Sequence, residues 1–491
     1  MTASTFGAQS KVSKTGDTMT GPLVLPAIQV TTGPAMGSVL TSDAAGNTSW
    51  QAADTVPVTA YHADPTGATD STTAIQNAVN AAVGPVYFPP GTYLISAAIT
   101  LPDKAVLVGA GSGTYTHDTG AMVSIIKLAN GANSSMFTIP TGHGSGRITD
   151  LQLNGNKANQ TGGGSAILFT AGSSAEEAQW HLTRLYVHDA FSSGIETQQF
   201  RQNNKITECV VYNCGGYGVN CSGSDSLVAN CTIGQNTLDG ILTSFVTHVQ
   251  GCDVWGNRTG INVPAAIRGV EISNCGVDRN LQHGIYIAGS SVDVVACTLH
   301  SNGQAANNTY GSITVDDTFG AVDSVTIGHC NFWLDAGYTN LPNYHIELKT
   351  VTSLAQVTVC SFKSGSYASG TINTPAQAAV TLPGVVSTGL LSANGGTTTA
   401  GSAPTLTPTF ANGTAAQLSD TTRDYMVYLT VGTAGTANTL AIGPTSTPSH
   451  TLISSSTATA GQMMVVRLPA GWFLKWSATT ATLATQTAVG C

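Results

Sequence analysis

Two carboxylates and one histidine lie next to Gly-Ile pairs that recur along the sequence: Glu196, Asp239 and His283. Hydrolysis of a glycosidic bond needs two carboxyl groups, about 5 Å apart for retention and roughly 6.5–9.5 Å apart for inversion. Glu196 and Asp239 fall two repeats apart, which is on the order of 10 Å in a stacked sheet and compatible with inversion. We therefore interpret Asp239 as a candidate general acid or base, Glu196 as the opposite carboxyl group and His283 as a neighbour that tunes their charge.

The residues around these three groups suit a sugar ligand. A glycan needs hydrogen-bond partners for its hydroxyl groups and flat rings beneath its C–H faces. Such residues flank the Gly-Ile pairs, and a second set follows the recurring cysteines of the sequence. The predicted contacts beside the Gly-Ile pairs are Tyr217, Asn220, Asn262 and Tyr286, and those of the second face are Trp255 and Trp333.

Simpler interpretations of the same residues stay open. Asp239 precedes a glycine, so it is also the type of residue that caps a turn, and His283 is also a typical solvated turn residue. The sequence thus supports either a polysaccharide-cleaving enzyme, with hydrolysis favoured over elimination, or a non-catalytic receptor-binding fibre or adhesin. A lyase would need a basic residue near a calcium-binding carboxylate cluster. Its candidates are Arg258, Arg268, Arg279, Asp253 and Asp278.

The elements that position these residues are the coils of a repeat. Seven cysteines recur at intervals of 21–23 residues, which widen to 33 and 30 at the end. Each is followed two residues later by an apolar residue, and this period of two marks a strand whose cysteine faces inward. A second strand follows in each repeat, in most of the regular repeats with a Gly-Ile pair at its start, and a third strand precedes the cysteine. The seven are Cys209, Cys231, Cys252, Cys275, Cys297, Cys330 and Cys360.

Three short strands per repeat of about 22 residues predict an all-β fold, a right-handed parallel β-helix. Stacked cysteines act as small hydrophobic residues in such a core. One cysteine per coil cannot supply the convergent ligands of a metal site. We therefore predict buried, reduced thiols, no metal site and no cofactor.

Changes in composition divide the chain. Residues 1–55 hold short strand-and-turn pieces with no core of their own. The β-helix is predicted over 56–390, with a capping helix near 70–82 that begins after a cap-like Asp70 and covers the open end of the solenoid. A Gly-, Thr- and Ser-rich linker follows over 391–408. Alternating segments over 409–491 predict a β-sandwich or jelly-roll domain.

Charge and hydropathy argue against several partners. The net charge is −9 and only 9% of the residues are charged, so no basic stripe is present for nucleic acid. No apolar run approaches the roughly 18 residues needed to span a membrane. The N-terminus lacks the apolar segment of a secretory signal. We expect a protein that folds in a reducing cytoplasm and inserts into no membrane.

Several segments resemble known phage proteins. HADPTGATDSTTAIQNAVNAA, VYFPPGTYLIS and VLVGAG resemble the opening of the pectate-lyase-like superfamily found in bacteriophage tailspikes, and KTGDTMTGPLVLP and GSVLTSDAAGNTSW resemble segments of phage tail fibre proteins. The resemblance implies a homotrimeric virion protein, made in the host cytoplasm, that acts at the host surface during adsorption. Residues 1–55 would bind phage tail or baseplate proteins. The β-helix would bind or depolymerise a host surface polysaccharide, and residues 409–491 would trimerise or bind a receptor.

Two further segments resemble polygalacturonase motifs. NTLDGIL around Asp239 and QHGIYIAGS around His283 occur in the order in which that family carries a catalytic aspartate and a catalytic-site histidine. Between them that family has a pair of aspartates, whereas this sequence has Arg258 and Thr259. The resemblance therefore implies roles for Asp239 and His283, and the family's acid pair is missing.

Overall fold

The computed structural model describes residues 55–373, with gaps at 115–121, 173–175, 178, 200, 319–321, 323, 350–354, 359 and 364. Outside that range it describes strands β1 (Ser38–Ser42) and β2 (Thr48–Ala52), short strands at 380–381, 386–387, 405–406 and 415–417, and residues 425–490 with gaps at 459–462, 471 and 479–481. No helix among these residues is long and apolar enough to cross a membrane.

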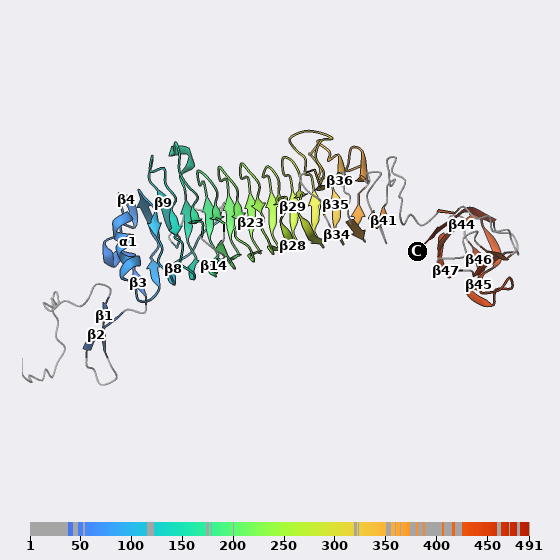
Figure 1. Ribbon diagram of the computed structural model, residues 1–491, viewed down its shortest axis with the longest axis horizontal. Coiled ribbons are helices and arrows are strands. Elements are labelled where there is room, and N and C mark those ends of the chain that lie inside the picture. The colour runs from blue at the N-terminus through green and yellow to red at the C-terminus, as the bar shows by residue number, and fades with distance from the viewer. Residues whose placement is uncertain are drawn as a thin grey trace, which may run out of the picture.

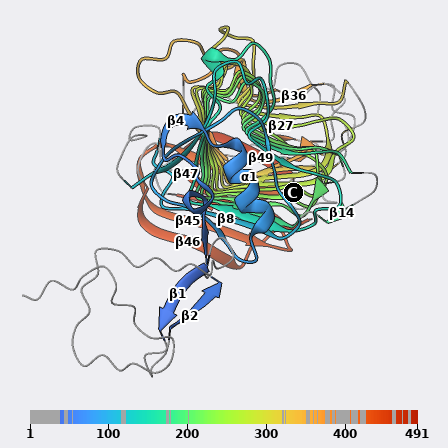
Figure 2. The same ribbon diagram turned by 90° about the vertical axis from the view of Figure 1, so that its left-hand side faces the viewer.

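The chain winds from residue 56 onward as a right-handed parallel β-helix with three strands per coil (Figures 1 and 2). The strands form three parallel sheets of 13, 13 and 11 strands, which we call sheets A, B and C in the order that the chain visits them within a coil. Sheet B carries the recurring cysteines at its strand starts, and sheet C carries the Gly-Ile pairs. The predicted fold class is therefore confirmed.

Sheet A consists of β3 (Val56–Pro57), β5 (Val86–Phe88), β8 (Ala105–Gly109), β11 (Gly146–Thr149), β15 (Trp180–Thr183), β19 (Lys205–Thr207), β22 (Leu227–Ala229), β25 (His248–Gln250), β28 (Arg268–Ser273), β31 (Ser290–Val295), β34 (Val325–Gly328), β37 (Ala355–Thr358) and β40 (Val380–Thr381). Sheet B consists of β4 (Thr66–Asp70), β6 (Gly91–Ile95), β9 (Ser124–Leu128), β12 (Gln152–Asn154), β16 (Tyr186–His188), β20 (Val210–Tyr212), β23 (Thr232–Gly234), β26 (Asp253–Trp255), β29 (Gly276–Asp278), β32 (Thr298–His300), β35 (Asn331–Trp333), β38 (Ser361–Phe362) and β41 (Val386–Ser387).

Sheet C consists of β7 (Ile99–Thr100), β10 (Phe137–Ile139), β13 (Ile167–Phe169), β17 (Ile195–Thr197), β21 (Val219–Cys221), β24 (Ile241–Leu242), β27 (Ile261–Val263), β30 (Ile285–Ile287), β33 (Ile313–Asp316), β36 (Tyr344–Lys349) and β39 (Gly370–Asn373). Between sheets C and A, β14 (Glu176–Glu177) pairs with β18 (Arg201–Gln202). Two short 3-10 helices, η1 (Val58–Tyr61) and η2 (Lys157–Asn159), complete the β-helix region together with helix α1 (Thr72–Ala81).

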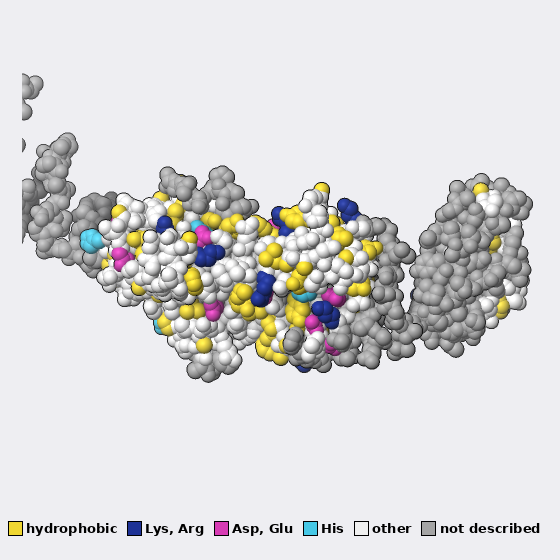
Figure 3. Space-filling model, turned by 90° about the horizontal axis from the view of Figure 1, so that it is seen from above, with side chains coloured by type: hydrophobic (Ala, Val, Ile, Leu, Met, Phe, Trp, Pro, Cys, Tyr) yellow, Lys and Arg dark blue, Asp and Glu magenta, His cyan; other side chains and the backbone are white. Residues whose placement is uncertain are grey.

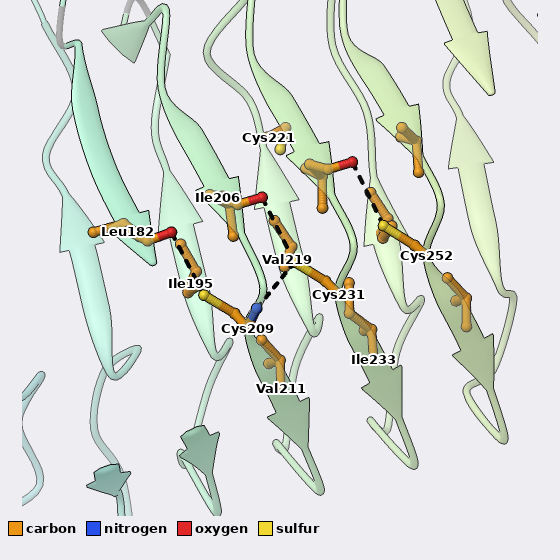
Figure 4. Packing of buried hydrophobic residues seen from close by; sticks show 14 of the residues in the cluster. Leu182, Ile195, Ile206, Cys209, Val211, Val219, Cys221, Cys231, Ile233 and Cys252 are labelled. Atoms are coloured by element: carbon orange, nitrogen blue, oxygen red, sulfur yellow. Dashed lines mark hydrogen bonds between the residues drawn. The ribbon is translucent and has the colours of Figure 1, made fainter. Parts of the chain in front are cut away.

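The core is a set of stacked columns of apolar side chains inside the three sheets. Alternation along each strand turns one residue inward and the next outward. Val211, Ile233 and Val254 occupy one such inward column and are 0% exposed. The seven recurring cysteines form the column two residues earlier and are at most 2% exposed (Figure 4). Each of these thiols contacts backbone carbonyl oxygens of its own coil and the preceding one, as Cys209 Sγ does with Leu182 at 3.5 Å.

Glycine and asparagine let the coils turn tightly before sheet C. A Cβ atom at Gly240 would lie only 2.7 Å from the carbonyl oxygen of Gly260, so a larger residue would separate the coils. On the turns between sheets B and C, four buried asparagines form a ladder in which the Nδ2 of each of the first three donates to the Oδ1 of the next at 2.9–3.2 Å. The ladder consists of Asn236, Asn257, Asn280 and Asn302.

Helix α1 covers the first coils, close to the predicted range of 70–82 (Figure 1). Its apolar residues Ile75, Ala78 and Val79 are buried. The predicted cap was wrong by one residue, because the N-cap is Ser71 and Asp70 ends strand β4. The Asp70 carboxylate still accepts the first helical N–H at 2.9 Å, so it satisfies a free donor from one position further back.

The two long repeats add loops between sheets B and C rather than extra strands. The loops span residues 301–311 and 334–343, and they contact each other through Gln304 and Asn340, which exchange side-chain-to-backbone hydrogen bonds at 2.8 and 3.1 Å. The backbone N–H of Asn308 also donates to the carbonyl of Leu341 at 3.0 Å. The loops therefore form one raised wall beside sheet C.

Near the C-terminus, the described strands form two four-stranded antiparallel sheets. Buried side chains among them include Leu429, Leu440 and Trp476. The strands are β42 (Thr405–Leu406), β43 (Ala415–Gln417), β44 (Tyr425–Thr433), β45 (Gly435–Gly443), β46 (His450–Ala458), β47 (Met463–Leu468), β48 (Phe473–Ser477) and β49 (Thr482–Gly490). Strands β1 and β2 form an antiparallel hairpin. The rest of residues 1–54 and most of the predicted linker at 391–408 lie outside the described residues.

The first prediction concerns the reactivity of the buried cysteines. All nine described cysteines are free and buried, and burial raises the pKa of the Cys221 thiol to about 12. We expect the nine thiols to react with a thiol reagent only after denaturation, because the stacked coils cover every one of these sulfur atoms. The measurement is thiol counting with and without denaturant on a C491S variant, which removes the one cysteine outside the described residues. Rapid labelling of most thiols in the native protein would contradict the stacked core.

Candidate functional site

Asp239 is buried and paired, in contrast to the outward, solvent-facing carboxylate that the sequence predicted. Its side chain is 0% exposed. Arg258 Nε donates to Oδ1 at 2.9 Å, and Asn262 Nδ2 donates to Oδ2 at 2.8 Å. The hydrogen bond to Asp239 is the main cause that raises the pKa of Arg258 above its usual value. The expectation was wrong because the arginine of the next coil covers the carboxylate.

Glu196 lies on β17, two coils from Asp239, and the structure does not bring the two carboxylates together. Glu196 is half-buried. Its carboxylate accepts a hydrogen bond from the Ser165 hydroxyl, and Gln198 Nε2 donates to its other oxygen at 3.4 Å. No hydrogen bond or ion pair joins it to Asp239 or Arg258 in the described part of the chain. Asp239 and Glu196 thus do not contact each other, and their predicted role as an acid–base pair stays a prediction.

The predicted sugar contacts beside the Gly-Ile pairs do share one surface. Asn220, Asn262 and Tyr286 lie in the outward column of sheet C that also contains Glu196 and Leu242. All are half-buried. Tyr217 lies at the edge of that sheet and interacts with Arg258. The sequence thus predicted the composition of this face correctly, and its use as a ligand surface stays a prediction.

His283 is not a solvated turn residue, because its side chain is 9% exposed. Its Nδ1 lies 2.8 Å from the Thr314 hydroxyl, and its ring packs against Tyr286 and Tyr310 at 5.2 Å between centroids. Burial, followed by the positive charge of Lys349, lowers the pKa of His283 to about 4. The imidazole is therefore neutral at neutral pH and serves as a hydrogen-bonding group.

Beyond His283 lies a carboxylate that the sequence analysis did not select, Asp316 on β33. It is 7% exposed. The Tyr286 hydroxyl donates to Oδ2 at 3.1 Å, and the backbone N–H of Thr318 donates to Oδ1 at 3.0 Å. Burial alone would raise the pKa of Asp316, but these hydrogen bonds and the charge of Lys349 lower it below its usual value. Asp316 is therefore ionised at neutral pH.

A second carboxylate, Glu347 on β36, lies one coil further along and is 5% exposed. The Thr314 hydroxyl and Asn343 Nδ2 each lie 3.3 Å from one of its oxygens, and Lys349 Nζ lies 3.9 Å away. Burial raises the pKa of Glu347 above its usual value, and the negative charge of Asp316 adds to that rise. The pKa of Glu347 is therefore shifted upward and that of Asp316 downward, although the two residues lie on neighbouring strands.

The register of β33 and β36 fixes the relative position of Asp316 and Glu347 on the sheet. Thr314 pairs with Glu347, and Asp316 pairs with Lys349, so the two acids are diagonal neighbours on one outward face. Strand spacing of about 4.8 Å and a two-residue rise of about 6.6 Å place their Cα atoms about 8 Å apart. Carboxyl groups separated by roughly 6.5–9.5 Å are typical of inverting glycoside hydrolases. Two carboxyl groups with opposite pKa shifts are the usual sign of acid and base roles.

The wall formed by loops 301–311 and 334–343 borders this site. Tyr310 reaches from the first loop to His283, and Asn343 reaches from the second to Glu347. Figure 3 looks down on these loops and shows acidic and basic side chains beside a histidine in the right-hand half of the face. The insertions therefore remove water from the carboxylates, which is the physical cause of the raised pKa of Glu347.

Trp255 and Trp333 lie on sheet B, on a different face from the carboxylates. Arg279 lies over the Trp255 ring at 5.2 Å. Trp333 stacks on His300 with ring centroids 4.5 Å apart, and its Nε1 donates to Asp335 at 3.0 Å. The faces of both indoles thus have partners within the chain. Their predicted role as sugar contacts has no support from this geometry and stays a prediction.

The lyase candidates do not form a metal centre. Arg258 pairs with Asp239, Arg279 with Asp278, and Arg268 lies on sheet A. Asp253 is exposed on sheet B. Among the residues that the structure describes, no group of three or more His, Cys, Asp or Glu side chains is arranged to hold a metal ion.

Three comparisons relate the chain to known proteins. The family model for rhamnogalacturonase A/epimerase, pectate lyase-like proteins matches residues 55–286. A segment aligned over 109 residues is 37% identical to mannuronan C5-epimerase AlgE6 of Azotobacter vinelandii, and it covers 19% of this chain and 11% of that protein. The chain thus spans only about a tenth of that relative.

Solved structures share the fold at low identity. The A-module of the Azotobacter vinelandii epimerase AlgE6 matches with a TM-score of 0.54 at 20% identity, covering 68% of this chain and 99% of that one. The enzymatically active domain of tailspike protein 2 of bacteriophage CBA120 matches with a TM-score of 0.55 at 14% identity, covering 93% and 79%. Tailspike protein gp49 of Acinetobacter baumannii bacteriophage Fri1, a capsular polysaccharide depolymerase, matches with 0.52 at 10%, covering 94% and 89%.

The burial of Asp239 makes the second prediction. Replacing Asp239 by Asn removes the charge that pairs with Arg258, and hydrogen bonds to charged groups contribute about 1.5–3 kcal/mol. We expect D239N to lower the free energy of unfolding by up to roughly 2 kcal/mol. Solvent at the partly exposed arginine screens the ion pair and reduces this loss. Denaturant unfolding measures it, with D293N on the exposed side of sheet A as the matched control. Equal stability of both variants would contradict a structural ion pair.

Proposed function

We propose that this protein is a phage tailspike whose β-helix binds and hydrolyses a host surface polysaccharide during adsorption. The observation that carries the proposal is the Asp316–Glu347 pair, two carboxyl groups at diagonally neighbouring outward positions of sheet C with opposite pKa shifts. Glu347 takes the role of general acid and Asp316 that of general base. This assignment replaces the predicted pair of Asp239 and Glu196, and it keeps His283 as a neighbour that holds the site.

Each group has a definite task in the proposed reaction. Glu347 donates its proton to the glycosidic oxygen as the bond between that oxygen and the anomeric carbon breaks. Asp316 accepts a proton from a water molecule whose oxygen bonds to the anomeric carbon from the opposite face, which inverts its configuration. Tyr286 holds Asp316, and Thr314 links neutral His283 to Glu347. Activity requires protonated Glu347 and ionised Asp316, so it falls above the pKa of Glu347 and below that of Asp316.

The comparisons support the wider context of the proposal. Two of the structural neighbours are phage tailspikes, and one of these is described as a capsular polysaccharide depolymerase. In this context the protein is part of the virion tail and acts outside the host cell. Residues 1–55 attach it to tail or baseplate proteins, and residues 409–491 serve trimerisation or receptor binding.

A second candidate function is that of a non-catalytic receptor-binding fibre. The observation in its favour is burial: Asp316 and Glu347 are only 7% and 5% exposed, so a sugar must displace Tyr286 or the wall to reach them. In that case the outward column of sheet C is a binding surface alone. Asn220, Asn262 and Tyr286 are then its sugar contacts.

Two conservative variants make the third prediction. We expect D316N and E347Q each to reduce release of reducing ends from the host polysaccharide by 10²–10⁴-fold, as typical for loss of a general acid or base. D293N and E271Q are matched controls on sheet A and should retain activity. A wild-type protein that binds the polysaccharide but releases no reducing ends would establish the receptor-binding alternative. Release of unsaturated products would indicate elimination instead.

The proposed trimer makes the fourth prediction. Light scattering of the full-length protein at micromolar concentration should give three times the 50.0 kDa mass of one chain. Removal of residues 409–491 should weaken the trimer and leave the β-helix folded, because the β-helix core lies entirely before residue 388. A stable monomer of the full-length protein would contradict a homotrimeric spike.

A further inference from the structure

A depression lies at the edge of sheet C where the chain turns toward sheet A, at least two coils before Asp316 and Glu347. Its volume is about 650 Å³, and strands β17 to β27 end beside it. It involves none of the residues around Asp316 and Glu347. It is lined by Gln198, Gln199, Gln202, Ser222, Ser224, Leu242, Thr243, Ser244, Phe245, Pro264 and Ile267.

The lining of this depression contains no charged side chain. Phe245 is 44% exposed, which is unusual for a large aromatic residue. Around it lie the amides of Gln198, Gln199 and Gln202 and the hydroxyls of several serines. Gln202 Oε1 accepts a hydrogen bond from the Ser224 hydroxyl at 2.9 Å, and its Nε2 has no hydrogen bond to another residue that the structure describes. A flat apolar ring among neutral amides is the chemistry that recognises an uncharged sugar.

The backbone next to Phe245 is strained. Seven residues at this turn stack in one column with positive φ, and Val246, with φ 50°, is the one β-branched residue among them. The other six are Gln179, Asn203, Asp225, Gly269, Ser291 and Ser324. Left-handed backbone is unfavourable for a β-branched residue. Because Val246 is also 43% exposed, burial offsets little of that strain.

We propose that this depression binds an uncharged sugar unit of a polysaccharide, independently of the proposed hydrolytic site. The C–H face of the pyranose ring packs on Phe245, with Val246 extending the apolar surface, and Gln198, Gln202 and Ser224 contact its hydroxyl groups. A ligand that covers Phe245 and Val246 explains why two large apolar side chains stay exposed at a turn where polar residues fit better.

The test is binding to an array of purified bacterial surface polysaccharides of known structure, both neutral and acidic. We expect wild-type protein to bind neutral members and F245A to bind them at least about tenfold more weakly. F191A is the matched control, since Phe191 is a similarly exposed phenylalanine, at 37%, on the turn between sheets B and C. Equal binding by F245A and wild type, or binding of acidic members alone, would overturn the proposal.

A second variant tests the strained valine. V246N should raise Tm, because asparagine tolerates the positive φ, and it should weaken binding to the same neutral polysaccharides. Unchanged binding by V246N would refute a role for the valine in ligand contact. Light scattering runs in parallel, and an F245A protein with an altered oligomeric state and intact glycan binding would identify the depression as a contact between copies. None of these measurements requires cleavage, so they stand apart from the test of Asp316 and Glu347.

Discussion

The structure depends on in-register stacking of each coil on the one before it. Parallel strands bond at about 4.8 Å from coil to coil, so any side chain has the equivalent residue of the neighbouring coil as its contact above and below. This spacing limits the size of the side chains that fit in each column. Cysteine and valine fill the inside of sheet B, asparagine bonds to asparagine at the turn, and Gly240 leaves room for the carbonyl of Gly260. A residue that is too large for its column would push the neighbouring coils apart at that position.

The same constraint explains what the sequence could predict. Cysteines and Gly-Ile pairs recur because every coil packs against its neighbours in the same way. The fold class, the strand order and the two faces of each strand can therefore be predicted from the amino-acid sequence. The helix and the outward column with Asn220, Asn262 and Tyr286 follow too. Periodicity assigns a residue to a column, but it does not say which neighbour it bonds. Arg258 covering Asp239 depends on the length and direction of a side chain, which no repeat pattern contains.

The carboxylate pair was missed for a related reason. Asp316 and Glu347 lie in the coils of 33 and 30 residues, where the repeat is least regular and columns are hardest to align from sequence. The signal available was the pair of insertions itself, since long loops on a rigid scaffold often carry function. The second loop also contacts one of the two carboxylates through Asn343, and burial is the main cause of the raised pKa of Glu347.

The two proposed sites use one sheet in different ways. The depression at Phe245 lies beside the ends of β17 to β27, whereas Asp316 and Glu347 lie on β33 and β36, three to five coils away from most of it, or about 14–24 Å. A polysaccharide is long enough to occupy both. Binding a neutral unit at a distance would raise the local concentration of scissile bonds at the carboxylates without adding any contact there. Because the solenoid is rigid, the spacing between the sites would select polymers whose repeat unit matches it.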